Sequence, residues 1–495
     1  MNFIKKVVVF TILICICFSI SSVAASDVND TDMAAYEDQV IGDTSDEVIT
    51  SSQDDLISSS NKGTFTELQN IINEAPRGST ITLDKDYTYD SEFNSTKGIE
   101  IKKDVTINGN GHTLNGLSKS RIFFIMFGEL DNHKVVLKDI TFKNGYTKLY
   151  GGAIFNFANL TVDKCVFKDN YADTTAGAIC SVGSLNCKNS NFEKNTANGD
   201  AGAIFSLNVR LHVQFFNNYY KGAKTIDISQ IIYNMIMSTE LVPSTDHITK
   251  CKFNKNVALG RGGGAVYAYT HIKIDSCTFT SNKANEMGGA VYGAKNLNII
   301  NSKFTSNQVS KYGGAVYFKC HEIKGSYDEN GNWNNNIVFY KCSIKNSVFT
   351  KNVAKQRGGA IYGFKYADMP KKPGAIAEKC TFSDNKANAG NELYGGSLKN
   401  CIFKNTLTLK TVKIKKSAKK LVLTATFKKG SKIYKNKKLT FTFNGVTYKA
   451  TTNSKGIAKV TIPSKVLKKL KVGNKIKYKV ESTSFADRKS AVVIK

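Results

Sequence analysis

The chain has 495 residues and a formal net charge of +29, with 41% hydrophobic and 22% charged residues. This length leaves room for several domains at ~150 residues each. Residues 407–495 hold 24 Lys and one Arg against two acids, which gives +23 and leaves +6 for residues 1–406. A uniformly basic chain is therefore excluded, and the strong basicity belongs to a C-terminal segment.

The N-terminus has the three parts of a secretory signal. Lys5 and Lys6 precede the apolar run from Val7 to Ile20, and the small residues Val23-Ala24-Ala25 follow. This pattern predicts a signal peptide over residues 1–25, because the run is shorter than the ~20 apolar residues of a membrane span. An uncleaved anchor is the alternative. We expect an exported chain that is not an integral membrane protein after cleavage.

An acidic spacer and a helical cap are predicted next. Within residues 26–62, positions 27–61 carry ten acids and no base, with few large apolar residues, which favours disorder. Between Thr64 and Ala75, apolar residues recur at helical spacing, and Pro76 ends the pattern. We expect this helix to cover the open apolar end of a repeat domain.

An internal repeat dominates residues 63–406. A unit of the form C/S-x-F-x-x-N-x-A followed by G-G-A-I/V-Y/F recurs with a basic period of 25 residues. Short β-type runs with glycine turns at this period predict coils of a right-handed parallel β-helix, ten to twelve in number. Helical solenoid repeats are longer and lack this glycine spacing.

Equivalent residues of stacked coils must form columns along the axis. Three inward columns are predicted. One is aliphatic: Ile154, Ile179, Ile204, Val266, Val291, Val316, Ile361 and Leu393. One is aromatic: Phe142, Phe167, Phe192, Phe253, Phe279, Phe304, Phe349, Phe382 and Phe403. One is a hydrogen-bonded amide column, whose asparagines tolerate a left-handed turn: Asn170, Asn195, Asn256, Asn282, Asn307, Asn352 and Asn385. The paired glycines are expected to supply positive φ.

Three stretches interrupt the period. We predict a degenerate coil near Phe216 with an insertion from Tyr219 to Asp246, a second insertion from Gly325 to Asn336, and a short loop containing Pro370 and Pro373. Insertions in solenoids leave from one face, often the binding face.

The repeat resembles that of the polymorphic outer-membrane proteins. The order of signal peptide, acidic spacer, pectin-lyase-like β-helix and lysine-rich Ig-like domain resembles adhesin-like surface proteins of methanogenic archaea. The repeat departs from its pattern at Ala176-Gly177 and Ala201-Gly202, where one glycine is replaced. The resemblance implies surface display and adhesion.

Five tyrosines follow the aliphatic column by one residue, so strand alternation predicts that they lie on the outer, exposed face. A tyrosine ladder there would either stack on sugar rings or stabilise the solenoid by ring stacking. The candidate residues are Tyr267, Tyr292, Tyr317, Tyr362 and Tyr394.

Cysteine alternates with serine two residues before the Phe, which predicts buried free thiols. The alternative is disulfide formation between Cys251 and Cys277 on adjacent coils, or between Cys320 and Cys342 beside the second insertion.

No catalytic constellation, cofactor site or metal site is predicted. Asp139, Asp163 and Asp275 are scattered acids that share roughly one column beside lysines or a serine. The rival hypothesis is a polysaccharide lyase or hydrolase, since many pectin-lyase-like β-helices are enzymes; it requires convergent carboxylates in one groove.

The segment 407–495 alternates polar and apolar residues with period two, and Asn444-Gly445 and Asn453 to Gly456 are turn signals for hairpins. It predicts a β-sandwich of immunoglobulin type, which is all-β like the coils. Its lysines either solubilise the domain or dock it electrostatically on an acidic polymer. Nucleic acid is not expected, because aromatic residues are not interleaved with the lysines.

Together these features predict an extracellular, cell-surface or wall-associated adhesin-like protein. Its expected partners are a cell-surface polysaccharide, a cell-wall polymer or the surface of another cell.

Overall fold

The computed structural model describes residues 62–95, 97–126, 133–208, 245–327, 333–364, 374–403, 407–415, 417–429, 432–482 and 486–494. The predicted signal peptide and nearly all of the predicted acidic spacer lie outside the described residues. Within the described ranges, no helix has both the length and the apolar character needed to cross a bilayer.

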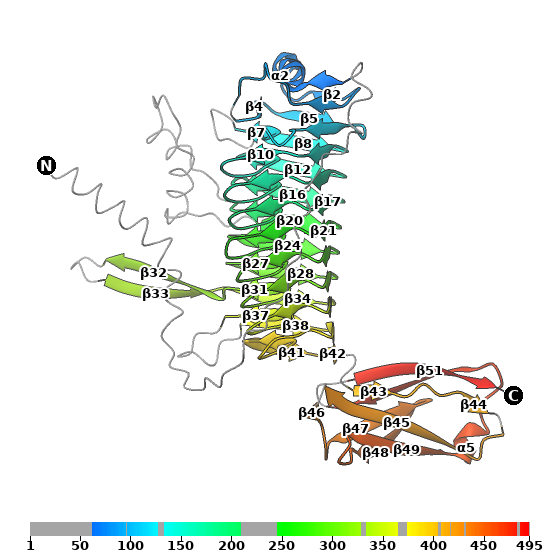
Figure 1. Ribbon diagram of the computed structural model, residues 1–495. Helices are drawn as coiled ribbons and strands as arrows, with labels where there is room; N and C mark the ends of the chain where they lie inside the picture. Colours follow the sequence, from blue (N-terminus) through cyan, green and yellow to red (C-terminus); the bar gives the residue numbers. More distant parts are fainter. Residues whose placement is uncertain are drawn as a thin grey trace, which may run out of the picture. The chain divides into compact units, whose positions relative to one another are not determined.

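Residues 63–403 form a right-handed parallel β-helix, as predicted, whose short strands stack coil on coil (Figure 1). Over the described residues the strands form four parallel sheets. The eleven-stranded sheet contains β2 (Thr80–Thr82), β5 (Val105–Asn108), β8 (Lys134–Lys138), β12 (Asn159–Asp163), β16 (Leu185–Lys188), β20 (Thr245–Thr249), β24 (His271–Asp275), β28 (Leu297–Ile300), β34 (Cys342–Lys345), β38 (Ala375–Glu378) and β41 (Gly396–Lys399).

Each coil continues from this sheet into the twelve-stranded sheet, and seven of the coils then continue into the seven-stranded sheet. The twelve-stranded sheet contains β1 (Gly63–Thr64), β3 (Tyr87–Thr88), β6 (Thr113–Asn115), β9 (Thr141–Lys143), β13 (Val166–Lys168), β17 (Asn191–Glu193), β21 (Lys252–Asn254), β25 (Thr278–Thr280), β29 (Lys303–Thr305), β35 (Val348–Thr350), β39 (Thr381–Ser383) and β42 (Ile402–Phe403). The seven-stranded sheet contains β10 (Tyr146–Thr147), β14 (Tyr171–Ala172), β18 (Thr196–Ala197), β22 (Val257–Ala258), β26 (Lys283–Ala284), β30 (Gln308–Val309) and β36 (Val353–Ala354).

The ten-stranded sheet closes the coil. It contains β4 (Ile99–Ile101), β7 (Phe123–Ile125), β11 (Ile154–Asn156), β15 (Ile179–Ser181), β19 (Ile204–Ser206), β23 (Val266–Ala268), β27 (Val291–Gly293), β31 (Val316–Phe318), β37 (Ile361–Gly363) and β40 (Leu393–Tyr394).

The predicted columns are confirmed by the register of the strands. The aliphatic column pairs residue with residue from Ile154 to Leu393, and all its members but Leu393 are buried. The aromatic column stacks face to face, with ring centroids 4.7 Å apart from Phe142 to Phe167 and 5.6 Å apart from Phe382 to Phe403. Both columns contribute to one continuous hydrophobic core, which supplies most of the driving force for folding.

The asparagine column is also confirmed, but the prediction that its members take the left-handed turn is wrong. The left-handed residue precedes each asparagine, as at Asp169, with φ 55°, before Asn170. A second left-handed corner precedes the Cys/Ser position, as at Lys164, also with φ 55°. The asparagine side chain instead accepts backbone and side-chain hydrogen bonds from the coil before it, because it faces the interior.

The two glycines of each pair have different roles, so the expectation that both supply positive φ is wrong. The first is left-handed, as at Gly288 with φ 64°, and Ala176 and Ala201 adopt the same conformation in two coils. The second has no positive φ, but a Cβ at Gly289 would lie 2.2 Å from the carbonyl oxygen of Gly314 in the next coil. The second position therefore requires glycine because backbones approach closely there.

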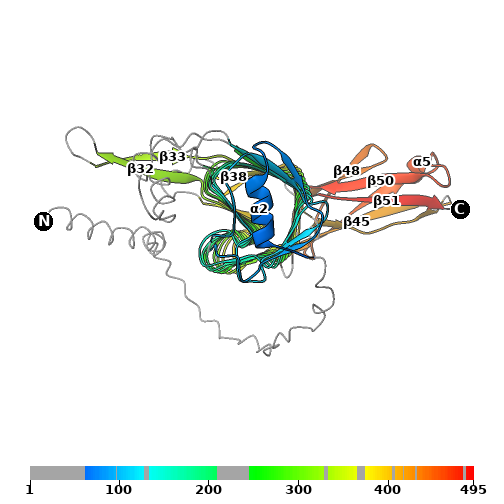
Figure 2. The same ribbon diagram turned by 90° about the horizontal axis from the view of Figure 1, so that it is seen from above.

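The predicted cap is helix α2 (Phe65–Glu74), and it lies across the end of the coil stack (Figure 2). Thr64 is its N-cap, and its Oγ1 accepts a hydrogen bond from the backbone N of Glu67 at 3.1 Å. Phe65, Leu68 and Ile72 are buried in the β-helix core. Gln69 exchanges two hydrogen bonds with the backbone of Glu100 in β4, which satisfies part of an otherwise open strand edge.

No coil lies between β17 and β21, because Phe192 pairs directly with Phe253. The predicted degenerate coil at that point is therefore wrong, and Phe216 lies outside the described residues. Asp246, predicted to end the insertion, belongs to β20. The second predicted insertion is an antiparallel hairpin of β32 (His321–Tyr327) and β33 (Trp333–Phe339). The predicted loop with Pro370 and Pro373 lies outside the described residues.

Residues 407–494 form two further sheets around a hydrophobic core of their own. One sheet contains β43 (Leu407–Leu409), β45 (Lys420–Lys429), β46 (Lys432–Ile433) and β49 (Ile457–Pro463), with helix α5 (Ser464–Leu467) following β49. The other, the five-stranded sheet, contains β44 (Ile414–Lys415), β47 (Lys438–Phe443), β48 (Val446–Thr451), β50 (Lys475–Glu481) and β51 (Ala486–Ile494).

The Asn444-Gly445 hairpin is confirmed, with φ 46° and 80° between β47 and β48. Asn453 to Gly456 is not a hairpin turn, because β49 pairs with β45 of the other sheet rather than with β48. The immunoglobulin type of this unit stays a prediction.

Candidate binding surfaces

All insertions of more than one residue that the Asn column records fall at one corner of the coil. Three of the six separations between consecutive members of this column are 25 or 26 residues, and the other three are 61, 45 and 33 residues. The extra residues, 209–244, 321–339 with their flanks, and 365–373, each connect a strand of the ten-stranded sheet to the next strand of the eleven-stranded sheet. Residues 127–132, between β7 and β8, occupy the same connection. We call this connection the insertion corner.

A buried carboxyl group supports the insertion corner between Asn208 and Thr245. Asp246 is fully buried and pairs with Ile272, so it occupies an inward position that is aliphatic in the next coil. Its carboxylate accepts hydrogen bonds from the backbone N of Leu185 at 2.8 Å, from Asn208 Nδ2 at 2.5 Å and from the Ser206 hydroxyl. Burial raises the pKa of Asp246 to about 7.

Sequence reasoning missed Asp246. The signal was an acid at an inward position of β20, where alternation demands an apolar residue.

The five candidate tyrosines form one continuous stack on the side of the ten-stranded sheet that faces away from the main core. They pair in register, and their ring centroids are 4.2, 4.9, 5.2 and 5.4 Å apart from Tyr267 to Tyr394. They belong to a separate hydrophobic cluster with Tyr269, Met287 and Tyr312. In earlier coils the same column holds Phe124, Phe155, Cys180 and Phe205.

The expectation that these tyrosines are exposed is wrong for the middle of the ladder. Tyr292, Tyr317 and Tyr362 are only 8, 6 and 6% exposed. The turn before each glycine pair covers them: the Tyr312 ring lies 4.8 Å from Tyr362, and Arg357 lies over Tyr394 at 5.0 Å. Little ring surface is left for a sugar, so the geometry favours ring stacking that stabilises the solenoid.

The acids that were weighed for catalysis do not share one column. Asp163 and Asp275 occupy the same outer column, with Lys188 Nζ 3.4 Å from Asp163 and Lys273 Nζ 3.9 Å from Asp275. Asp139 is instead a left-handed corner residue, one position further along the coil. Across the described ranges, no cluster of three or more His, Cys, Asp or Glu side chains is placed to hold a metal ion.

The cysteines in the described ranges are free thiols. Cys251 and Cys277 lie on adjacent coils as predicted, with the Cys251 backbone N donating to Cys277 Sγ at 3.4 Å. Cys251 Sγ is 3.8 Å from Cys187 Sγ, a neighbour that the sequence did not indicate. Cys320 and Cys342 are both buried beside the hairpin. Disulfide formation by either predicted pair stays a prediction.

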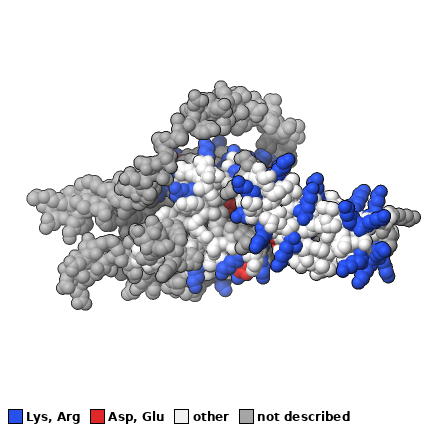
Figure 3. Space-filling view, turned by 90° about the horizontal axis from the view of Figure 1, so that it is seen from below, with Lys and Arg blue, Asp and Glu red and all other residues white. Residues whose placement is uncertain are grey.

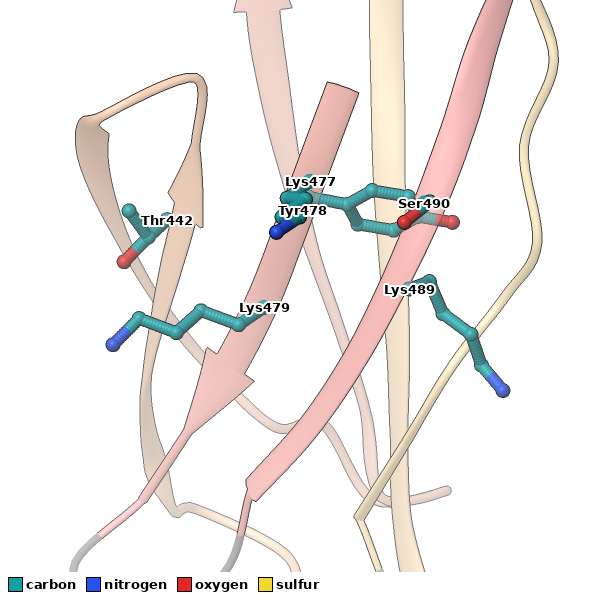
Figure 4. Close-up of a pocket in the computed structure, with 6 residues that line it drawn as sticks. All are labelled: Thr442, Lys477, Tyr478, Lys479, Lys489 and Ser490. Carbon is teal, nitrogen blue, oxygen red and sulfur yellow. The ribbon is translucent and has the colours of Figure 1, made fainter. Parts of the chain in front are cut away.

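The five-stranded sheet carries a lysine-lined hollow of about 790 Å³. Thr442 and Lys479 are direct partners on β47 and β50, and Lys477 pairs with Ser490 of β51. Lys479 extends toward Thr442, while Lys489 extends in the opposite direction from β51 (Figure 4). Tyr478 also lines the hollow, and its hydroxyl donates to the carbonyl oxygen of Lys410 at 2.9 Å. We call Lys477, Lys479 and Lys489 the lysine groove.

The lysine groove is part of a wider excess of positive charge. Residues 407–495 contain 25 basic residues and only Glu481 and Asp487 as acidic residues, an excess of 23 positive charges. Lys479 pairs with Glu481 at 2.8 Å. In Figure 3 basic side chains crowd the visible face, with few acidic ones between them. Such a surface attracts polyanions at low ionic strength.

The fold and the columns define the class of this protein: a parallel β-helix built from a glycine- and asparagine-marked repeat. In agreement, residues 276–294 and 346–363 match the family model of the Chlamydia polymorphic membrane protein repeat. Both matched segments run from the Cys/Ser turn through Phe and Asn to the glycine pair and the strand after it. No curated protein and no solved structure matches the chain.

Proposed function

We propose that this protein is an exported, cell-surface adhesin-like protein. Its β-helix displays the insertion corner to glycans or to other cells, and its basic C-terminal unit contacts a cell-wall or other acidic polymer. The similarity to polymorphic membrane protein repeats supports the surface location. The protein acts by binding rather than by catalysis.

One observation carries this proposal: the three long insertions between members of the Asn column all lie at the insertion corner. Between Asn170 and Leu393 the other corners change by no more than one residue, because the asparagine, phenylalanine and glycine columns must stay in register from coil to coil. A solenoid of this design can vary one edge without disturbing its core, which is how repeat proteins present binding loops.

The hairpin of β32 and β33 gives a direct test of the insertion corner. Residues 319–341 are replaced by Ala294-Lys295-Asn296, the three-residue connection at the equivalent point of the preceding coil. Binding of the full-length variant to a glycan array and to whole cells is measured beside its thermal midpoint. We expect an unchanged midpoint and lost or reduced binding.

The matched control alters a different outer face: Thr280→Ala with Thr305→Ala in the twelve-stranded sheet. It should bind as the parent does. Undiminished binding after hairpin removal would contradict the role of the hairpin in adhesion.

The lysine groove is tested with immobilised polygalacturonate and neutral dextran over graded NaCl. A chain carrying Lys477→Gln, Lys479→Gln and Lys489→Gln should elute from the polyuronate at lower salt than the parent. The control carries Lys420→Gln, Lys428→Gln and Lys459→Gln, three exposed lysines of the other sheet. Equal elution of both variants would reject the groove as the specific contact, and salt-insensitive binding would reject electrostatic docking.

A further inference from the structure

Cys380 and Cys401 occupy the same repeat position in two consecutive coils at the C-terminal end of the β-helix. β39 pairs with β42, and the Ile402 backbone N donates to the Cys380 carbonyl oxygen at 2.8 Å. Neighbouring parallel strands lie about 4.8 Å apart, which is within the range of Cα separations that a disulfide spans. The two side chains are therefore positioned for covalent linkage by the register of the sheet.

Both thiols are held in place by backbone carbonyl groups. Cys380 Sγ lies 3.3 Å from the carbonyl oxygen of Glu378, and Cys401 Sγ lies 3.3 Å from that of Lys399 and 3.4 Å from that of Ala377. The interaction with the Cys380 side chain lowers the pKa of Cys401 to about 7, and the interaction with Cys401 raises the pKa of Cys380.

Accessibility separates this pair from the other adjacent cysteines. Cys401 is half-buried, whereas Cys251 and Cys277 are each 1% exposed. Burial raises the pKa of Cys251, and the hydrogen bond to Cys251 raises the pKa of Cys277. A thiolate reacts only where it forms and where an oxidant reaches it, so Cys401 meets both conditions and the buried pair meets neither.

We propose that Cys401 is a reactive thiol and Cys380 its resolving partner, and that a small-molecule disulfide oxidises them to a disulfide linking the last two coils. The Cys401 thiolate attacks one sulfur of the small disulfide, which forms a mixed disulfide and releases one thiolate. The Cys380 thiol passes its proton to that thiolate and attacks Cys401 Sγ, which expels the second small thiolate. Two protein thiols are oxidised, and one small disulfide is reduced to two thiols.

The link joins the part of the β-helix with the least burial. β40 and β42 are two residues long, Leu393 is only partly buried, and Leu398 is 39% exposed. Short strands with exposed apolar side chains open locally at low cost. A disulfide from Cys380 to Cys401 would hold this last coil against such opening.

The test uses the full chain and oxidised glutathione as the probe, followed by alkylation of free thiols, trypsin digestion and mass spectrometry. Cleavage after Lys379, Lys386, Lys399 and Lys404 places the two cysteines on separate peptides. We expect the two peptides to become linked with loss of two hydrogen atoms, and Cys401 to be alkylated before any other cysteine in the reduced protein. Wild-type mapping requires no variant and therefore no assumption about folding.

Two variants separate the roles of the thiols. Cys380→Ser should trap glutathione on Cys401, because no resolving thiol remains, whereas Cys401→Ser should leave Cys380 unmodified. Cys277→Ser, a buried position of the same column, should leave the linkage unchanged. Stable glutathione on Cys401 in the wild type, an unreactive Cys401, or equally fast linkage of Cys251 to Cys277 would each overturn the proposal.

Discussion

Asn256 Nδ2 donates to Asn282 Oδ1 across 2.9 Å, and the backbone N of Asn256 donates to the same oxygen across 3.0 Å. Asn256 Nδ2 also donates to the carbonyl oxygen of Phe192 at 3.0 Å. The backbone N and the side-chain Nδ2 of Asn195, in the preceding coil, donate in the same way to Asn256 Oδ1. Each asparagine thus satisfies the backbone at a corner where two sheets meet and no strand ladder continues.

Replacing Asn256 by Ala should therefore destabilise the β-helix strongly. The backbone N and side-chain amide of Asn195 lose their acceptor, and the Phe192 carbonyl loses a donor, all at buried positions. We expect a loss of about 3 kcal/mol, since each unsatisfied buried group costs about 1–3 kcal/mol. Chemical denaturation of the full chain measures it. Asn254→Ala, two residues away on the outer face, should change stability by less than about 0.5 kcal/mol; equal losses would contradict the role of the column.

The two glycines of a pair should respond differently to alanine. Gly288→Ala places a Cβ 2.3 Å from the Val291 carbonyl oxygen of the same turn, in a left-handed conformation. Ala176 and Ala201 occupy the equivalent position in two other coils, so the turn can adjust to a Cβ, and we expect a loss of about 1–2 kcal/mol. Gly289→Ala forces Cβ to within 2.2 Å of the Gly314 carbonyl oxygen and 2.6 Å of that of Gln308, so we expect about 3 kcal/mol or more. Thermal midpoints of the two variants measure the difference, and the reverse order would refute our assignment of the two positions.

The 25-residue period made the interior of the β-helix predictable. Phe167, Ile179 and Asn170 recur at fixed offsets, and stacked coils turn a fixed offset into a column. The left-handed corners were not predictable, because Asp169, Lys194 and their equivalents share no residue type that marks positive φ. The recurring asparagine, a residue type that tolerates positive φ, lies one position after each of these corners, so residue type predicts the wrong position.

The candidate surface was harder to read from the sequence than the core. Alternation correctly placed Tyr292 away from the aliphatic column, but it carries no information about what covers the outer face. The covering column holds Gly262, Met287, Tyr312 and Arg357, which have no common chemistry and so leave no periodic signal. Burial by irregular turns is a tertiary effect that a strand pattern does not encode.

Truncating the tyrosine ladder should lower stability. Tyr317 is 6% exposed and stacks on Tyr292 at 4.9 Å and on Tyr362 at 5.2 Å. We expect Tyr317→Ala to cost about 3–5 kcal/mol, as for other large buried aromatic side chains, and Tyr317→Phe to cost much less because the ring stays. Thermal denaturation of each variant measures the contribution of the ring to stability. A glycan array, probed at a temperature where the same variant is folded, measures its contribution to sugar binding. Weakened glycan binding by folded Tyr317→Ala would revive the sugar-stacking hypothesis.

Asp246 should make the stability of the β-helix depend on pH. Its folded-state pKa is about 7, against about 3.9 in an unfolded chain. Between about pH 4 and pH 7 the folded state binds more protons at this group than the unfolded state does. The contribution of Asp246 to the free energy of unfolding is therefore largest below about pH 4 and falls as the pH rises toward 7. The slope is at most about 1.4 kcal/mol per pH unit.

The Asp246→Asn variant removes this dependence, because an amide fills the same space without a charge to desolvate. We expect this variant to be more stable than the parent at pH 8. At that pH the parent holds a buried carboxylate, and its three described hydrogen-bond donors, Leu185 N, Ser206 Oγ and Asn208 Nδ2, are all neutral. Urea denaturation at pH 5, 6, 7 and 8 measures both effects. Asp275→Asn on the outer face should retain the parental slope. If Asp246→Asn keeps the pH dependence of the parent, another group is responsible for it. If Asp246→Asn is less stable than the parent at pH 8, the fold requires the ionised carboxylate rather than the protonated carboxyl group.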